Sequence, residues 1–307
     1  MSLPRIGITL GDPGGIGPEI VIRSLANLSL IPDANYTIYG SSSVLEAEER
    51  SLDIELDRKK ISVREVGQLP SVVKKGTVDK DNGAAAFLYF KEVVAAARAG
   101  EIKAVVTAPI SKLCWRLGGI RWRGHTEYLA QFYPEAVMTF WSEKMKVALF
   151  SHHLSLKKAI GRVRKKNLAA FFRILGESVA EARPGTYEFL VAGLNPHAGE
   201  DGLLGGEERE EIIPAIKEAK AAGLNISGPY PPDGVFRNAF GHPERVVIAL
   251  YHDQGLIAFK LAAFGTGVNV TLGMPFIRTS PDHGPAFDIA GKKLADARSM
   301  IEAIRLA

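Results

Sequence analysis

The chain has 307 residues, of which 46% are hydrophobic and 23% are charged, and its formal net charge is +4. This size and composition predict a soluble globular protein with one large or two ordinary domains. No run of about 18 apolar residues and no nucleic-acid-binding motif occurs, so neither a membrane nor a nucleic acid is an expected partner. The absence of a secretory pattern and the single cysteine, Cys114, predict a cytoplasmic protein without an internal disulfide.

Short apolar runs that are typical of buried strands alternate with longer helical patterns along the chain. The expected strands are RIGITL (5–10), YTIYG (36–40), KAVVT (103–107), KVALF (146–150), YEFLVAGL (187–194), RVVIALY (245–251) and VNVTL (268–272). The expected helices cover 84–99, 166–182 and 207–222, and each ends near a glycine or an RPG turn. This alternation predicts an α/β protein with a largely parallel sheet.

The first expected strand runs into the glycine-rich segment GDPGGIGPEI at 11–20. A Walker loop needs glycine where Ile16 stands, and the dinucleotide fingerprint needs glycine where Ile20 stands, so neither pattern fits. Pro18 suits the first helical position and places Glu19 in the first turn, where a carboxylate disfavours a bound pyrophosphate. We therefore interpret the glycines as a tight turn, held by bonds from Asp12 to the backbone.

Six polar segments follow the ends of expected strands, and the carboxyl edge of an open α/β sheet is where ligands bind. Three of these segments carry His153, His197 and His252, each just past a different strand. Three imidazoles with an open fourth position are typical of a catalytic zinc, cobalt, nickel or iron(II) site, although structural histidines are the alternative. His125 and Thr126 precede a helix, either as a capping turn or as donors to a polar substrate.

Basic and amide residues recur late in the chain, at Lys260, Asn269 and Arg278. An arginine can bind a phosphate or carboxylate through two parallel hydrogen bonds, and a buried asparagine needs partners. Surface salt bridges are the alternative for Lys260 and Arg278. Asp253 and Asp233 are either counterions to a substrate amine or caps of loops.

Taken together, these motifs resemble the 4-hydroxythreonine-4-phosphate dehydrogenase family of vitamin B6 biosynthesis. The segments that carry the resemblance, in order from Ile6 to Gly291, are GDPGGIGPEI, TAPISK, GHTEYLA, GLNPHAGE, YHDQG and VNVTLGMPFIRTSPDHGPAFDIAG. The resemblance implies the isocitrate and isopropylmalate dehydrogenase-like α/β fold, with two lobes around a central cleft. We expect one lobe to comprise 1–114 and 268–307, and the other to comprise 115–267. We also expect a homodimer, with much of its interface on the second lobe and the active site close to that interface.

The same resemblance implies roles for individual residues. His153, His197 and His252 would be the metal ligands. His125, Thr126, Lys260, Asn269 and Arg278 would bind the substrate. We expect Lys260 or an ordered water to act as the acid/base, with Asp253 as a second catalytic candidate, and no residue is assigned to the nicotinamide cofactor.

The implied reaction is an NAD-dependent or NADP-dependent oxidation, with decarboxylation, of 4-phosphooxy-L-threonine to 3-amino-2-oxopropyl phosphate. Zinc is the expected metal, with cobalt or magnesium as alternatives. Three segments depart from the family pattern, with the extra His152 in SHHLSL, Gly234 in PPDGVF, and Pro281 and Pro285 in SPDHGPAFD. These departures leave 4-phospho-D-threonate and D-erythronate 4-phosphate open as substrates. A metal-dependent hydrolase is the alternative of another class, because an open three-histidine site can also activate water.

Overall fold

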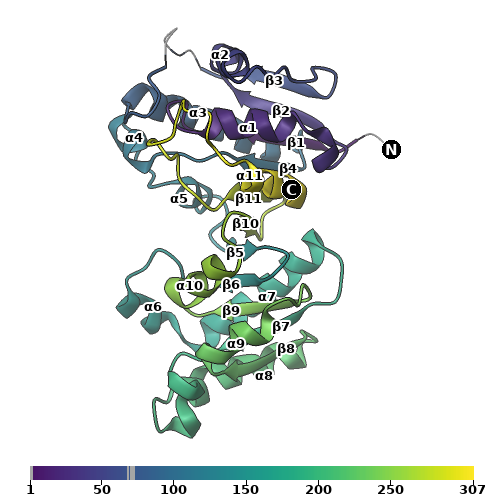
Figure 1. The fold of residues 1–307 in the computed structure, drawn as a ribbon. Helices are drawn as coiled ribbons and strands as arrows, with labels where there is room; N and C mark the ends of the chain where they lie inside the picture. Colours follow the sequence, from purple (N-terminus) through teal and green to yellow (C-terminus); the bar gives the residue numbers. More distant parts are fainter. Residues whose placement is uncertain (1–2, 68, 70–72) are drawn as a thin grey trace. The chain divides into compact units, whose positions relative to one another are not determined.

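The structure, a computed structural model, describes residues 3–67, 69 and 73–307. The chain divides into two compact units, the first comprising Met1–Pro134 with Pro275–Ala307 and the second comprising Glu135–Met274 (Figure 1). No helix in the described ranges is long and apolar enough to cross a membrane.

The first unit is built on a parallel sheet with the strand order β3-β2-β1-β4-β11. Its strands are β1 (Arg5–Thr9), β2 (Asn35–Gly40), β3 (Ile61–Glu65), β4 (Ala104–Thr107) and β11 (Ile277–Pro281). Its helices are α1 (Gly17–Leu25), α2 (Ser42–Leu52), α3 (Lys80–Arg98), α4 (Lys112–Leu117), α5 (His125–Leu129) and α11 (Arg298–Leu306), with a 3₁₀ turn η1 (Leu28–Leu30). All four residues of β4 are buried, as expected for a central strand of a parallel sheet.

The second unit has a mixed sheet with the strand order β10-β5-β6-β9-β7-β8, in which β5 runs antiparallel to both of its neighbours. Its strands are β5 (Val137–Trp141), β6 (Lys146–Leu149), β7 (Glu188–Ala192), β8 (Ile226–Tyr230), β9 (Arg245–Ala249) and β10 (Val268–Leu272). Its helices are α6 (Leu156–Arg162), α7 (Lys165–Ala182), α8 (Ile213–Ala221), α9 (Pro232–Ala239) and α10 (His252–Ala262), with the 3₁₀ segment η2 (Pro196–Gly202) and the π-helical segment η3 (Glu208–Ile212). Leu149, Ala249 and Phe259 lie in a buried cluster that joins β6, β9 and α10.

The boundaries of the two units differ from those that the sequence suggested. A boundary between 114 and 115 would cut through α4, whose Trp115 packs against Phe90 of α3 with ring centroids 6.1 Å apart. A boundary between 267 and 268 would remove β10 from the second unit, yet β10 hydrogen-bonds along β5. These two contacts explain why the first unit extends to Pro134 and the second to Met274.

Helix α3 begins at Lys80 rather than at the expected Ala84 because of its cap. The Asp79 side chain accepts hydrogen bonds from the backbone N–H groups of Asp81 and Asn82, at 2.8 and 3.0 Å. Such a cap satisfies donors that a helix end leaves free. The apolar pattern alone shows only where the helix becomes buried.

Candidate active site

The polar loops at the carboxyl edge of the first sheet lie against one another. Asp12, in the loop after β1, donates its backbone N–H to Pro109 in the loop after β4, at 2.9 Å. Ile16 donates in the same way to Pro285, in the loop after β11, at 2.9 Å. Loops from three different strands therefore meet at this edge, as the sequence predicted for ligand-binding segments.

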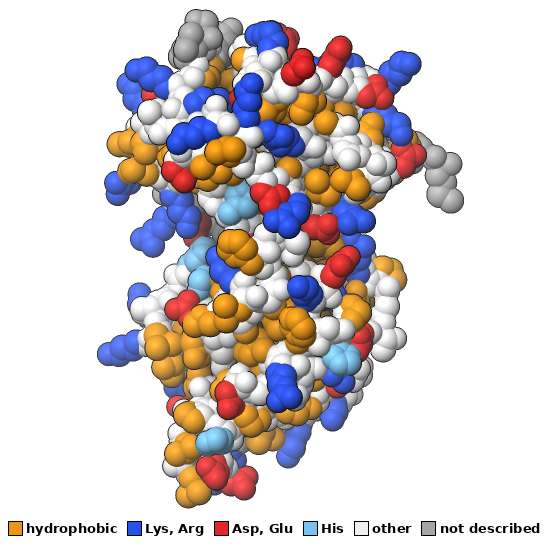
Figure 2. Space-filling view, in the orientation of Figure 1, with side chains coloured by type: hydrophobic (Ala, Val, Ile, Leu, Met, Phe, Trp, Pro, Cys, Tyr) orange, Lys and Arg blue, Asp and Glu red, His pale blue; other side chains and the backbone are white. Residues whose placement is uncertain are grey.

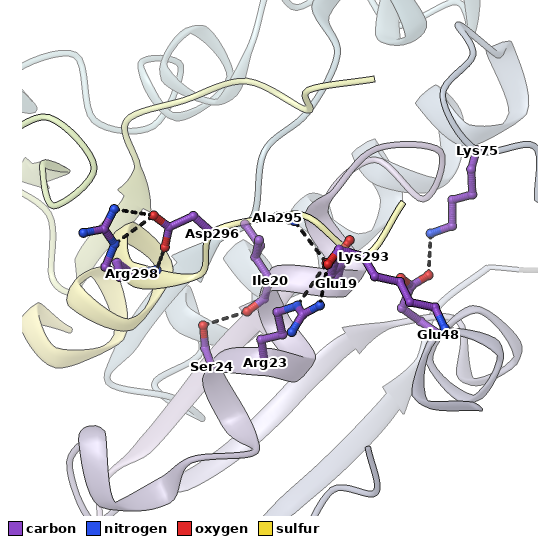
Figure 3. Close-up of polar contacts among 10 residues, drawn as sticks. All are labelled: Glu19, Ile20, Arg23, Ser24, Glu48, Lys75, Lys293, Ala295, Asp296 and Arg298. Atoms are coloured by element: carbon purple, nitrogen blue, oxygen red, sulfur yellow. Dashed lines mark hydrogen bonds and ion pairs between the residues drawn. The ribbon is translucent and has the colours of Figure 1, made fainter. Parts of the chain in front are cut away.

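The glycine-rich loop is a tight turn, as expected. The Asp12 carboxylate accepts a hydrogen bond from the Gly14 N–H at 2.9 Å, which confirms its predicted role in the turn. Glu19 lies buried in the first turn of α1 and accepts hydrogen bonds from Arg23 and from the Ala295 N–H, at 2.9 and 3.1 Å (Figure 3). A carboxylate therefore lies near the amino end of α1, a position that favours negative charge. In a phosphate-binding loop, the phosphate of the ligand would occupy this position instead.

A buried guanidinium lies near the start of β11. Arg278 is 3% exposed, and no acidic side chain in the described part of the chain forms an ion pair with it. Burial lowers the pKa of Arg278 to about 10, so the group is still charged at neutral pH. A buried charge is costly unless it is paired, which makes this cation a strong candidate for binding an anion.

Two neutral side chains hold this guanidinium. Nε and Nη2 of Arg278 donate to Oγ1 of Thr107 at 3.0 and 2.5 Å, and Nη2 also lies 3.0 Å from Nδ1 of His125. Arginine can only donate, so Nδ1 of His125 accepts and the ring proton resides on Nε2. Burial, together with the charges of Arg278 and Lys112, holds the pKa of His125 well below its usual range, which keeps the ring neutral.

Aromatic rings enclose this pair. The His125 ring packs against Phe90 and Trp115, with centroid distances of 4.2 and 5.4 Å, and its buried Nε2 has no hydrogen-bond partner in the described residues. Thr126, the next residue, is half-buried in the first turn of α5. The cluster thus offers a fixed cation and an unpaired imidazole N–H, the donor types that suit a phosphate or carboxylate.

In the second unit, the three loops that carry the predicted metal ligands adjoin one another. Ser151, beside His152, donates its hydroxyl hydrogen to the Leu250 carbonyl at 2.7 Å. Gln254, at the start of α10, donates its side-chain N–H to the Gly193 carbonyl, also at 2.7 Å. These contacts tie the loops after β6, β7 and β9 to one edge of the second sheet.

Two of the three predicted metal ligands line one pocket of about 290 Å³. The rings of His153 and His252 have their centroids 6.1 Å apart, and His152 is 5.2 Å from His153 by the same measure. Nδ1 of His252 lies 2.7 Å from Oδ1 of Asp253, which leaves Nε2 as the nitrogen available to a metal. A carboxylate bonded to the second nitrogen of a histidine is a common way to orient a metal ligand.

His197 is not among the residues that line this pocket. It begins a run of five residues, 197–201, with φ between 41° and 80°, a left-handed turn that is unfavourable for the four residues other than Gly199. The buried Glu208 holds the base of this loop, because its Oε1 accepts the N–H groups of Leu194 and Asn195, both at 2.7 Å. Such strain persists only where surrounding contacts enforce it, and it occurs often at functional sites.

In the described ranges, no group of three or more His, Cys, Asp or Glu side chains is placed to hold a metal ion. His153 and His252 share one pocket, and Asp253 lies within hydrogen-bond distance of Nδ1 of His252. Of the three predicted ligands, His153 and His252 line this pocket and His197 does not, and their role as a metal-binding set stays a prediction.

The remaining predicted residues lie in the second unit. Lys260 is exposed in the last turn of α10, and Asn269 on β10 is half-buried, with an Oδ1 that lacks a partner among the described residues. Asp233 is exposed in the first turn of α9, and Gly234 beside it would have open space around an added Cβ. Neither aspartate candidate is buried, because Asp233 is exposed and the side chain of Asp253 is 75% exposed.

Sequence reasoning missed Thr107 and Glu208, the residues that hold Arg278 and the His197 loop. Thr107 contacts an arginine 171 residues away, and Glu208 accepts hydrogen bonds from backbone N–H groups. A short sequence motif reveals neither kind of contact. The signal for Thr107 was its place as the last residue of an apolar strand and the first residue of the TAPISK segment.

A family model described as "Pyridoxal phosphate biosynthetic protein PdxA" matches residues 20–307. A curated 4-hydroxythreonine-4-phosphate dehydrogenase of Aquifex aeolicus is 42% identical, over 98% of this chain and 97% of that protein. A D-threonate 4-phosphate dehydrogenase of Cupriavidus necator is 38% identical, over 99% of this chain and 96% of that protein. Two differently named dehydrogenases thus match nearly the whole chain at similar identity.

Solved structures agree with these sequence matches. The crystal structure of a 4-hydroxythreonine-4-phosphate dehydrogenase from Klebsiella pneumoniae matches with a TM-score of 0.84 at 35% identity, covering 99% of this chain and 98% of that one. An isocitrate dehydrogenase from Methylococcus capsulatus matches with a TM-score of 0.52 at 15% identity, covering 98% and 84%. The latter likeness concerns the fold alone, and it confirms the expected isocitrate dehydrogenase-like α/β fold.

Proposed function

This chain belongs to the PdxA family of pyridoxal phosphate biosynthetic proteins and is an oxidoreductase acting on a CH–OH group, and we propose that its substrate is a small phosphorylated hydroxy acid. The observation that carries the proposal is Arg278, a buried cation without an acidic partner among the described residues. A phosphate or carboxylate of the substrate would supply the missing negative charge. The dehydrogenase names of the relatives favour this reading over a metal-dependent hydrolase.

We propose 4-phosphooxy-L-threonine as the substrate and 3-amino-2-oxopropyl phosphate as the product after loss of carbon dioxide. D-Threonate 4-phosphate is the second candidate, because a relative with that activity in its name is nearly as similar as one named for 4-hydroxythreonine 4-phosphate. D-Erythronate 4-phosphate is the third candidate, which the family resemblance of the sequence left open. All three share a phosphorylated end and a secondary alcohol.

The roles of the residues follow from their chemistry. Arg278, His125 and Thr126 would hold the anionic end, and neutral His125 would donate from Nε2. His153 and His252 would hold the divalent ion, zinc or alternatively cobalt or magnesium, with His197 as the third proposed ligand. Lys260 or an ordered water would accept the hydroxyl proton, and Asn269 would bind a polar group of the substrate.

When bound, a divalent ion would lower the pKa of the substrate hydroxyl, and NAD or NADP would accept the hydride. The side chains of this protein would orient the metal ligands and bind the substrate. Asp253, hydrogen-bonded to Nδ1 of His252, would leave Nε2 of that ring free for a metal. The fixed guanidinium of Arg278 would hold the phosphate end of the substrate in one orientation.

A panel of substrates tests this function. We expect NADH or NADPH formation, measured by absorbance, with at least one of the three phosphorylated hydroxy acids when zinc, cobalt or magnesium is added. The same compounds without phosphate should react at least about tenfold less efficiently, because they lack a charge-assisted contact. Release of inorganic phosphate without any reduced cofactor would instead support a hydrolase.

We also propose that the protein is a homodimer. Helix α10 exposes Ile257 and Leu261, at 64% and 83%, and Phe264, two residues beyond its end, is 91% exposed. The spacing of four residues places Ile257 and Leu261 on one side of the helix. On the face shown in Figure 2, hydrophobic side chains also gather over the second unit. A cluster of this kind is typical of a surface that another protein covers.

Leu261→Glu should therefore weaken the dimer, because a carboxylate would be buried without a partner in the interface. Sedimentation equilibrium should show the variant dissociating at concentrations at least about tenfold higher than the unaltered protein. Leu294→Glu is the matched control, because Leu294 is a 68% exposed leucine of the first unit. A monomeric unaltered protein, or equal dissociation of both variants, would contradict the proposed interface.

A further inference from the structure

The geometry points to Thr107 as a positioning residue that sets the direction in which Arg278 presents its guanidinium to an anionic ligand. This inference rests on the proposed function, in which Arg278 binds the phosphate end of the substrate. Thr107 is fully buried at the end of β4, beside β11 in the parallel sheet. Thr107 is the first residue of TAPISK, one of the segments that carry the family resemblance, but that resemblance gave it no role.

Every hydrogen-bonding position of the Thr107 hydroxyl is used. Oγ1 accepts the Nε and Nη2 hydrogens of Arg278, and its own hydrogen can reach the Thr279 carbonyl at 3.5 Å. A hydroxyl has one hydrogen to donate and two lone pairs to accept, so this set is complete. The side chain is therefore fixed by its three contacts as well as by the packing around it.

These contacts determine the orientation of the guanidinium. The group is planar and rigid, so two bonds from Nε and Nη2 to one oxygen fix which of its edges faces Thr107, and a second acceptor at His125 restricts its rotation about that oxygen. The contact between Nη2 and His125 occupies a further N–H. Nη1 is left with two N–H groups for which the described residues supply no acceptor, and it is not among the polar atoms sealed from solvent without a partner. Either of those two groups can donate a charge-assisted hydrogen bond to an oxygen of a phosphate.

A hydroxyl suits this role better than a carboxylate would. An aspartate or glutamate beside Arg278 would neutralise the cation and compete with an anionic ligand for it. Thr107 and neutral His125 accept hydrogen bonds without cancelling the charge. The guanidinium is thus held in place and yet keeps its attraction for an anion.

The test compares Thr107→Val with Thr107→Ser. Valine has nearly the shape of threonine but cannot accept the two N–H groups, whereas serine keeps the oxygen. Thr107→Val should raise the KM for the phosphorylated substrate about tenfold or more, with a smaller change in kcat. Thr107→Ser should have a KM close to that of the unaltered protein. Inorganic phosphate, added to protein without NAD or metal, should raise the Tm of the Ser variant and not that of the Val variant.

Thr139→Val is the matched control, because Thr139 is a fully buried threonine of the second unit whose hydroxyl donates to the Val270 carbonyl at 2.9 Å. It should lower the Tm without changing the KM. In an Arg278→Ala background, Thr107→Val should cause little further loss of kcat/KM, since its effect acts through the arginine.

Three outcomes would overturn the inference while the role of Arg278 stands. They are an unchanged KM in Thr107→Val, a retained response of that variant to phosphate, and failure of Thr107→Ser to restore binding. If Arg278→Ala itself leaves the KM of the phosphorylated substrate unchanged, the proposed role of the arginine is wrong instead. The two failures are therefore distinguishable with the same set of variants.

Discussion

Arg278→Ala should lower kcat/KM for the phosphorylated substrate by about ten- to a hundredfold or more. The variant loses a charge-assisted contact with the substrate, which contributes about 1.5–3 kcal/mol. With the dephosphorylated analogue, the same substitution should cost little, because that compound lacks the anionic group the guanidinium binds. Steady-state kinetics with both compounds measure the difference.

Arg278→Lys should recover only part of the activity, since an ammonium cannot make the same planar set of hydrogen bonds to Thr107 and to a phosphate. Arg50→Ala serves as the control, because Arg50 is 72% exposed and lies 3.9 Å from Glu46 in a surface pair of the same unit. That pair contributes about 0–1 kcal/mol to stability and none to binding. Equal losses with phosphorylated and dephosphorylated substrates would show that Arg278 does not recognise phosphate.

The sequence predicted the fold class and seven of the strands, but it missed strands whose residues carry weak β signals. Strand β11 reads IRTSP, with an arginine inside it and a proline at its end. Such a segment becomes a strand because its backbone pairs with β4 over Ile277–Thr279, a contact far away in the sequence. Strand β5 was missed although its residues, VMTFW, favour a strand, and its pairing with β10 and β6 makes this part of the sheet antiparallel.

Candidate site residues were predictable where chemistry and position agreed. Arg278 stood out as a cation in a polar segment, and the structure shows it buried beside His125, the residue named with it for substrate binding. The sequence could not show that a neutral hydroxyl, rather than an acid, holds the guanidinium. Nor could it show that Glu208 supports a left-handed turn at His197, because that contact depends on backbone N–H groups 13 and 14 residues away.

His153→Ala and His252→Ala should each remove the bound divalent ion and the activity together, while the fold persists. Both rings line one pocket, and each substitution deletes a proposed coordinating nitrogen. Loss of a carboxylate that only orients a ligand costs about 10- to 100-fold in metal affinity, so loss of a ligand should cost more. Metal content after gel filtration, measured beside activity and circular dichroism, gives the three readouts.

The neighbours of these two histidines make the experiment specific. His152→Ala should be much milder, although its ring also lines the pocket, because the resemblance places the ligand at His153. Asp253→Ala should weaken metal binding about 10- to 100-fold without abolishing it, since it would free Nδ1 of His252 rather than remove the ring. His197→Ala decides the third ligand, because full metal content in that variant would remove His197 from the set. If His152→Ala loses the metal and His153→Ala keeps it, the ligand in SHHLSL is the first histidine and the assignment is wrong by one residue.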